Sequence, residues 1–356
     1  MQLGINLGYF GLGNTSDGFA VAQEADRLGY SSCWGAEVYG SDAATVLAYV
    51  AAKTERIDIG SAIFQIPART PAMTAMTAAT LDMLSGGRFR LGLGVSGPQV
   101  SEGWYGVRFD KPLARTREFV EIVRAALARE RLEYTGEHWT LPLPDGPGKA
   151  LKLTIGPVRD PLPIYIAAIG PKNLEQTGRI ADGWLGIFFS PEHAEVSLAP
   201  LREGRGGSLE GFDVAPTVPV TFTRSDSESD LRAAADAQRA YTALYVGGMG
   251  SRSQNFYNQL ACRMGYEHAA AEIQEKYISG DTSGALAAVP YDLIDATTLI
   301  GTRERIADRL KAYAEAGVTT LIASHGGSAP GGSGPGLEER LATVRTLAEA
   351  AELAGV

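Results

Sequence analysis

Residues 57–97 read IDIGSAIFQIPARTPAMTAMTAATLDMLSGGRFRLGLGVSG and contain three successive structural elements. The apolar runs over 57–64 and 89–94 each predict a strand. Between them, Pro71 suits the first turn of a helix and Gly86 suits its end. The stretch therefore predicts a βαβ unit. Because parallel α/β proteins bind ligands at the carboxyl ends of their strands, the loops after these two strands are the first candidates for a site.

The same alternation of strand and helix continues through the chain. Six further apolar runs predict strands over 2–7, 31–34, 164–169, 184–188, 217–223 and 319–323. Eight strands with helices between them predict an α/β fold, a (β/α)8 TIM barrel formed as a single domain by residues 1–356. The alternative is a doubly wound open sheet with a helical lid. That alternative is weak because no G-x-G-x-x-G sequence opens a helix after the first strand.

Two segments interrupt the alternation. Residues 132–163 are rich in Pro and Gly and predict an insertion on the rim of the barrel. Residues from about 230 to 281 predict a helical excursion in the C-terminal half, too long for a single crossover. We expect both rim insertions to shape the substrate pocket.

Composition excludes several classes of protein. The formal net charge of −9 argues against nonspecific binding to nucleic acid or to anionic membranes. The sequence has no apolar run of membrane-spanning length and no basic-then-apolar leader, so we expect a cytoplasmic protein. Two cysteines outside any C-x-x-C pair and four scattered histidines predict neither a disulfide nor a metal site.

One acidic residue stands at a strand end. Glu37 follows the second predicted strand, within an otherwise apolar, small-residue stretch. A carboxyl group there can act as an acid or a base, or it can form a salt bridge or accept a hydrogen bond from a loop amide. The sequence leaves these alternatives open. The third strand ends in the apolar residues Ala62, Ile63 and Phe64, followed by Gln65, which predicts a supporting wall rather than an acid–base group.

The segment IAAIGPKN, residues 166–173, follows the fifth strand. Small side chains permit a close backbone approach, and Gly170–Pro171 begins a helix whose free amides face the expected site. Lys172 adds a positive charge. These features suit a phosphate group, although an ordinary strand-to-helix turn would have the same sequence.

The sequence has no Ser–His–acid set, H-E-x-x-H motif, carboxylate pair or Walker A motif. An enzyme without these groups relies on a cofactor for its chemistry. Small residues at the strand ends and one phosphate cradle suit a flat, phosphorylated, flavin-like cofactor.

Four segments resemble the luciferase-like monooxygenase superfamily, and within it the coenzyme F420-dependent oxidoreductases. They are residues 55–104 (ERIDIGS…SEGW), 111–127 (KPLARTREFVEIVRAAL), 164–185 (IYIAAIGPKNLEQTGRIADGWL) and 247–277 (GGMGSRSQ…EIQEKY). The resemblance implies a (β/α)8 barrel, a small-molecule substrate and a homodimer. It also implies hydride transfer with coenzyme F420, an 8-hydroxy-5-deazaflavin. Relatives that use reduced FMN and oxygen make a two-component FMN-dependent monooxygenase the alternative. A barrel that only stores or senses such a ligand is a third possibility.

The resemblance also implies roles for particular residues. A non-proline cis peptide at Ala62–Ile63 would form a bulge behind the middle ring of the deazaflavin. Residues 95–97 would hold its pyrimidine edge, and residues 167–170 would approach its side chain and phosphate. The expected cofactor-binding residues are Ala62, Ile63, Gln65, Val95, Ser96, Gly97, Ala167, Ala168, Ile169, Gly170 and Lys172.

The chain departs from part of the family pattern. Sugar-phosphate and alcohol dehydrogenases of the family carry an acid–histidine pair after the second strand and a glutamate after the fourth-strand glycines. Here those places read GAEVYG and GVSGPQ. The departure favours a reductase of an unsaturated bond, an imine or a methylene-pterin, with Glu37 as the candidate catalytic proton carrier.

Overall fold

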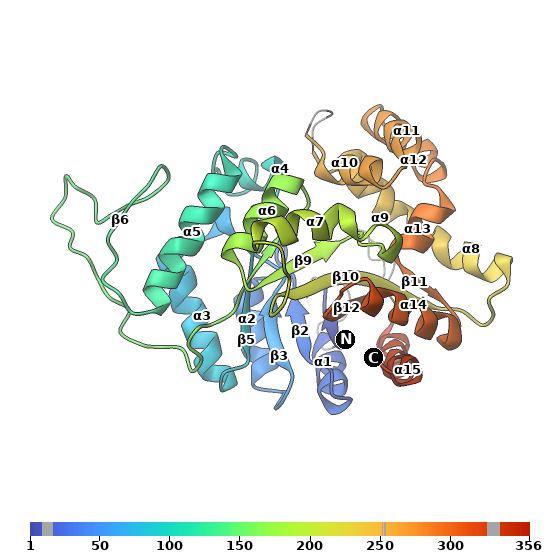
Figure 1. Cartoon of the computed structure of the whole chain (residues 1–356), viewed down its shortest axis with the longest axis horizontal. Helices are drawn as coiled ribbons and strands as arrows, with labels where there is room; N and C mark the ends of the chain where they lie inside the picture. The colour runs from blue at the N-terminus through green and yellow to red at the C-terminus, as the bar shows by residue number, and fades with distance from the viewer. Residues whose placement is uncertain (9–16, 251, 253, 326–334) are drawn as a thin grey trace.

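A closed barrel of eight parallel strands forms the centre of the computed structural model, which describes residues 1–8, 17–250, 252, 254–325 and 335–356 (Figure 1). Strand β10 pairs with β9 through its first half and with β12 through its middle, which closes the ring. The predicted (β/α)8 fold is therefore confirmed. The barrel strands are β1 (Gln2–Asn6), β2 (Ser32–Gly35), β3 (Asp58–Ser61), β5 (Phe89–Gly94), β8 (Ile164–Ala167), β9 (Gly183–Ile187), β10 (Asp213–Phe222) and β12 (Thr320–His325).

Helices surround this barrel and bury the main apolar core between themselves and the strands (Figure 1). Local signals fix several of their ends. The Asp42 side chain caps α2 by accepting a hydrogen bond from the amide of Thr45, and Thr70 caps α3 in the same way at Met73. The outer helices are α1 (Asp17–Arg27), α2 (Ala43–Ala51), α3 (Pro71–Ser85), α5 (Pro112–Leu127), α6 (Pro171–Ile180), α7 (Glu195–Gly204), α14 (Arg303–Glu315) and α15 (Leu337–Ala354).

The strand predictions need three corrections. The run over 57–64 forms β3 and a separate short strand, β4 (Phe64–Gln65), with the cis peptide Ala62–Ile63 between them. Strand β10 begins four residues earlier than expected, since the segment before Thr217 pairs with β9. Strand β11 (Leu299–Gly301), which pairs with the end of β10, was not predicted because three residues show no periodicity.

The two rim insertions differ in content. Between 132 and 163 the chain forms only a small antiparallel hairpin, β6 (Tyr134–Thr135) with β7 (Thr140–Leu141). The helical excursion has an apolar cluster of its own and continues to residue 297, beyond the predicted limit of about 281 (Figure 1). It comprises α8 (Glu228–Asp236), α9 (Arg239–Ala243), a π-helix (Leu244–Gly248), α10 (Phe256–Arg263), α11 (Glu267–Ile278), α12 (Thr282–Ala287) and α13 (Tyr291–Thr297).

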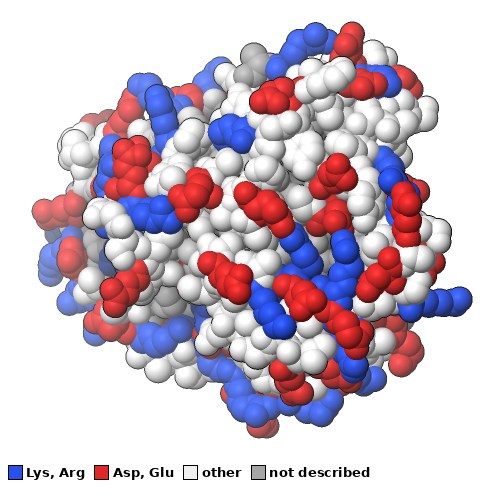
Figure 2. All heavy atoms as spheres, turned by 45° about the vertical axis from the view of Figure 1, so that its right-hand side comes forward, with Lys and Arg blue, Asp and Glu red and all other residues white. Residues whose placement is uncertain are grey.

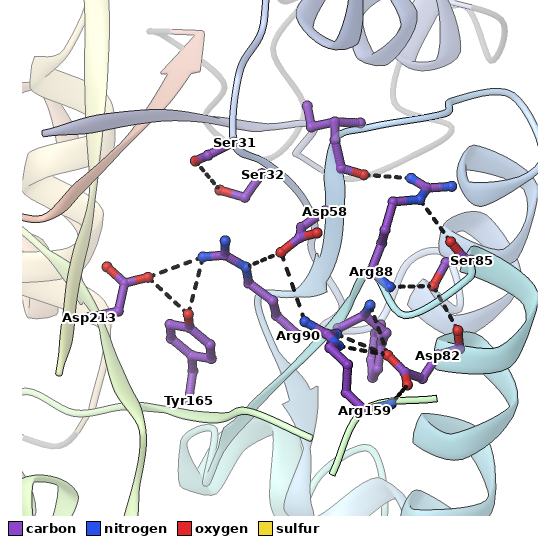
Figure 3. Close-up of polar contacts among 12 residues, drawn as sticks. Ser31, Ser32, Asp58, Asp82, Ser85, Arg88, Arg90, Arg159, Tyr165 and Asp213 are labelled. Atoms are coloured by element: carbon purple, nitrogen blue, oxygen red, sulfur yellow. Dashed lines mark hydrogen bonds and ion pairs between the residues drawn. The ribbon is translucent and has the colours of Figure 1, made fainter. Parts of the chain in front are cut away.

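A charged cluster occupies the amino end of the barrel lumen (Figure 3). Arg90 of β5 donates to Asp58 (2.8 Å), to Asp213 (3.1 Å) and to the Tyr165 hydroxyl (3.1 Å). Tyr165 in turn donates to Asp213 at 2.9 Å. Burial and then Asp213 raise the pKa of Tyr165. Burial disfavours the Arg90 cation, but Tyr165, Asp58 and Asp213 outweigh it and raise the pKa of Arg90.

The outer surface carries charges of both signs. Figure 2 shows Lys and Arg side chains interspersed with Asp and Glu on the face that includes the C-terminal helices. Ion pairs such as Arg303–Glu349 and Arg305–Asp295 contribute to this mixture. Among the residues that the structure describes, no helix combines the length and the apolar character needed to cross a lipid bilayer.

The Arg90 cluster predicts a large loss of stability on substitution. Arg90→Met leaves Asp213 without its cation and Asp58 with only the more distant Arg159, 4.0 Å away, so we expect the free energy of unfolding to fall by about 3–5 kcal/mol. Urea denaturation followed by circular dichroism measures it. The exposed pair Arg232–Glu228 provides the matched control, and Arg232→Met should leave the free energy of unfolding nearly unchanged. Equal losses in the two variants would contradict the structural role of the cluster.

Candidate active site

The floor of the candidate site is the apolar filling of the barrel lumen. Side chains from five strands form this filling, and Ala62, Ile63 and Ala167 pack on it near the carboxyl ends. The buried members of this lumen cluster are Trp34, Tyr165, Leu185, Ala215 and Ile322. The cluster separates the charged amino end of the lumen from the carboxyl end, where barrel enzymes bind their ligands.

The expected bulge lies at this end of the lumen. The Ala62–Ile63 peptide is cis, as the resemblance implied. The Ile63 side chain crosses to β5, where a Cβ at Gly94 would overlap its Cδ1 atom and would lie 3.6 Å from the Cβ of Ala167. Glycine at 94 therefore permits the close approach of three strands. The structure thus brings together Ala62, Ile63 and Ala167, which are far apart in the sequence.

A chain of hydrogen bonds runs beside the bulge. The Gln65 Nε2 atom donates to Ser96 Oγ at 2.5 Å, and the Tyr105 hydroxyl donates to Gln65 Oε1 at 2.9 Å. Ser96 has a left-handed backbone with φ 57°. Because Ser96 Oγ accepts from Gln65, its own O–H can donate to a further group. Burial and then Glu37 raise the pKa of Tyr105, which keeps its hydroxyl protonated.

Val95 and Gly97, the other two residues expected to hold the pyrimidine edge of the cofactor, are placed differently from Ser96. Val95 packs against the core under the helices rather than in the lumen, so it can face the site only with its backbone. Gly97 is the N-cap of the short helix α4 (Pro98–Ser101). Tyr105 was not among the predicted site residues, since no local pattern shows that its ring reaches Gln65.

The helix start after β8 forms the cationic side of the site. Gly170 is the N-cap of α6, Pro171 is its first residue, and Lys172 is exposed beside them. The Arg263 guanidinium, from α10, donates to the carbonyl oxygen of Ile169 at 3.1 Å. The helix amides and two cations together suit a phosphate.

Arg263 and Ala168 both lie near the start of α6, but only Arg263 offers its side chain to the site. Arg263 was missed because it lies in the helical excursion, and nothing in its neighbourhood marks it as a partner of the strand end. Ala168 is buried in the core under the helices, and its carbonyl accepts a hydrogen bond from Trp184 Nε1 at 2.9 Å. It can therefore approach a ligand only with its backbone.

Glu37 is engaged by two structural contacts. Its Oε2 atom accepts from the amide of Ala43 and from Arg69 Nη2, both at 3.0 Å, and the side chain is 7% exposed. Arg69 also pairs with Asp42 and lies over the Phe64 ring, 4.6 Å from its centroid. These are the salt bridge and amide contact that the sequence left open. An acid–base role for Glu37 stays a hypothesis.

A barrel with a flat apolar bulge, a hydroxyl donor and a cationic helix start has the features that bind a flat, phosphorylated cofactor. The comparison with protein families agrees with this class. The model of the luciferase-like monooxygenase family matches residues 11–320, and the chain belongs to this family.

Several relatives carry more specific names. A Mycobacterium tuberculosis protein named as a coenzyme F420-dependent oxidoreductase is 42% identical over 92% of this chain and 95% of its own length. A 5,10-methylenetetrahydromethanopterin reductase of Archaeoglobus fulgidus is 28% identical over 84% of this chain and 86% of its own. The solved F420-dependent tetrahydromethanopterin reductase of Methanopyrus kandleri has a TM-score of 0.78 at 24% identity, covering 99% and 97% of the two chains.

The Glu37 contacts predict a stability effect rather than a catalytic one. Glu37→Gln keeps an acceptor for the Ala43 amide but removes the charge beside Arg69, so we expect the free energy of unfolding to fall by about 1–3 kcal/mol. We expect cofactor affinity and the pH profile of turnover per folded enzyme to stay unchanged. If the pH profile loses a limb while the stability is retained, Glu37 carries a proton in the reaction.

Proposed function

We propose that the chain is a coenzyme F420-dependent oxidoreductase that reduces an unsaturated bond, an imine or a methylene-pterin. The observation that most supports this proposal is the 42% identity with the M. tuberculosis protein over nearly the full length of both chains. The residues after β2 favour reduction of the substrate over its oxidation. They include no acid–histidine pair, and the Glu37 carboxylate is already paired with Arg69.

The residues at the carboxyl end fit a phosphorylated deazaflavin. Ile63 and Ala62 would support one face of the ring system, and the Ser96 hydroxyl would donate to a carbonyl oxygen at its pyrimidine edge. The amides at the start of α6, with Lys172 and Arg263, would hold the phosphate. These assignments use the cofactor residues expected from the sequence and add Arg263.

When bound, a reduced deazaflavin supplies a hydride. The protein contributes by positioning the cofactor and the substrate. Ile63 would support one face of the ring, which would leave the opposite face to the substrate. The Gln65–Ser96 hydrogen bond fixes the orientation of the Ser96 donor, and Tyr105 holds Gln65 in place. A carbonyl or imine substrate also needs a proton, and Glu37 would supply it only if Glu37→Gln removed a limb of the pH profile, because its carboxylate is already bound to Arg69.

A titration with the two candidate cofactors tests the proposal. We expect the purified protein to bind coenzyme F420 more tightly than FMN, as measured by the change in cofactor fluorescence. Ser96→Ala removes the hydroxyl donor and should weaken F420 binding about three- to tenfold. Ser279→Ala, at the end of α11, is the control and should leave it unchanged.

Tight binding of FMN without binding of F420 would overturn the proposal. Oxygen consumption with reduced FMN and an organic substrate would then assign the chain to the two-component monooxygenases. If F420 binds but a broad panel of substrates leaves it neither oxidised nor reduced, the barrel is a storage or sensing protein.

We also propose that the chain forms a homodimer through α2 and α3. These two helices pack side by side, and α2 contains no charged residue. The charged residue of α3, Asp82, is fully buried. Their outer faces expose an apolar surface made of Tyr49, Met73, Met76, Met83 and Leu84, with the Lys53 ammonium at its margin, 5.4 Å from the centroid of the Tyr49 ring. An exposed apolar surface marks an interaction site, and the same surface on a second copy can cover it across a two-fold axis.

The dimer proposal predicts dissociation by one introduced charge. Met76→Glu places a carboxylate within this apolar surface, where the two copies of the charge would face an apolar partner, so we expect the monomer mass in size-exclusion chromatography with light scattering. Leu151 is also an exposed apolar side chain but lies outside α2 and α3, so the Leu151→Glu variant should remain dimeric. A monomeric wild-type protein would contradict the proposal.

A further inference from the structure

A small cavity lies at the carboxyl end of the barrel, between the barrel wall and the helical excursion. Its volume is about 20 Å³, which is room for about one or two water molecules. Strands β9, β10 and β12 supply one wall, and the α8–α9 junction and the segment before β11 supply the other. The lining residues are Ile187, Phe188, Thr217, Pro219, Gln238, Tyr241, Thr242, Thr297, Thr298 and Ser324.

The cavity lies across the lumen from the bulge that would support the cofactor. In the closed ring of strands, β10 is opposite β3, with β2, β1 and β12 between them on one side and β5, β8 and β9 on the other. Thr217 and Ser324 lie two residues after Ala215 and Ile322 of the lumen cluster, so strand alternation turns them toward the lumen. A substrate facing a cofactor on the bulge would extend toward this cavity.

The cavity is polar but uncharged. None of its ten lining residues is Lys, Arg, His, Asp or Glu, and seven of them carry a hydroxyl or an amide. Phe188, with a left-handed backbone at φ 55°, closes one side by stacking on Tyr241 with ring centroids 5.5 Å apart. A carboxylate or phosphate entering this space would find no cation among the described residues that line it, and an unpaired buried charge is strongly disfavoured.

Three of the lining hydroxyls already donate their hydrogen to the protein. The hydroxyls of Thr297 and Thr298 each donate to a carbonyl oxygen of α13 at 2.7 Å, and that of Thr242 donates to the Gln238 carbonyl at 3.1 Å. These hydroxyls therefore retain only their acceptor lone pairs.

Gln238 differs from these threonines. Its side chain is 2% exposed, and its Nε2 atom is buried without a hydrogen-bond partner among the described residues. A buried amide without a partner is unfavourable unless a bound molecule supplies the acceptor.

We propose that Gln238 is a specificity-determining residue, and that its side-chain amide donates a hydrogen bond to an uncharged oxygen of the substrate. The substrate class is then a neutral carbonyl or hydroxyl compound rather than a carboxylate or a phosphate ester. This inference rests on the proposed function, because it places the substrate at the carboxyl end of the barrel, opposite the cofactor support.

The test measures ligand binding to enzyme loaded with oxidised coenzyme F420, so that no turnover occurs. The probes are 2-cyclohexen-1-one and cyclohex-1-ene-1-carboxylate, which have similar shapes and differ in charge. Titrations followed by ligand-detected NMR are made on wild type, Gln238→Leu and the control Gln176→Leu. The control removes a part-buried amide that donates to Leu113 outside the cavity. The Kd for F420 and the melting temperature are measured for each protein.

We expect wild type to bind the ketone at least about tenfold more tightly than the carboxylate. Gln238→Leu should weaken ketone binding about three- to tenfold and leave F420 affinity unchanged. Since Gln238 Nε2 has no hydrogen-bond partner in the described part of the chain, replacing this residue should not lower the melting temperature, whereas a purely structural role would lower it. Gln176→Leu should leave ketone binding unaltered.

Provided that F420 binds, any of three results would overturn the inference. They are equal affinity for the two probes, no binding of the ketone, and ketone binding that Gln238→Leu leaves unchanged. Failure of F420 to bind wild type would instead overturn the proposed function, and the two failures are thereby distinguished.

Discussion

The Arg90 guanidinium connects strands from opposite sides of the barrel, and the placement of the site depends on this connection. Asp58 is the first residue of β3 and Asp213 the first residue of β10, and Arg90 bonds to both (Figure 3). Such a buried charge is tolerated because each carboxylate and the Tyr165 hydroxyl supply a partner. At their other ends, β3 leads into the Ala62–Ile63 bulge and β10 lines the uncharged cavity. The Arg90 contacts therefore hold together the amino ends of the two strands whose later residues carry these two features.

The fold could be predicted from the sequence wherever one strand or helix is long enough to show its own pattern. The strand over 89–94 has the predicted limits, and helix α3 begins at Pro71 as expected. Errors occurred where pairing with distant strands decides the structure. The early part of β10 is a strand because it pairs with β9, and β11 exists because it pairs with the end of β10. Neither partner is visible in a local pattern.

The site was predictable to a similar extent. Positions at strand ends could be inferred from the alternation of strands and helices, and the cis peptide could be inferred from the family resemblance. Contacts between distant segments could not. Arg263 reaches the carbonyl of Ile169, Tyr105 reaches Gln65, and Glu37 is paired with Arg69. In each case the residue type was readable, but its role depends on a partner 32 or more positions away that only the folded chain identifies.

The helical excursion joins the two halves of the site. Arg263 at the end of α10 lies on the cationic side, and Gln238 before α9 lies in the uncharged cavity. Helices α8, α9, α10, α11 and α12 all contribute to the one apolar cluster of the excursion, so packing there constrains both residues. Ionic contacts with a phosphate tolerate small displacements, because charge attraction changes slowly with distance. A single hydrogen bond in a cavity of about 20 Å³ is lost on a small displacement, because it depends steeply on distance and angle. Changes in the packing of the excursion should therefore alter substrate selection before they alter cofactor affinity.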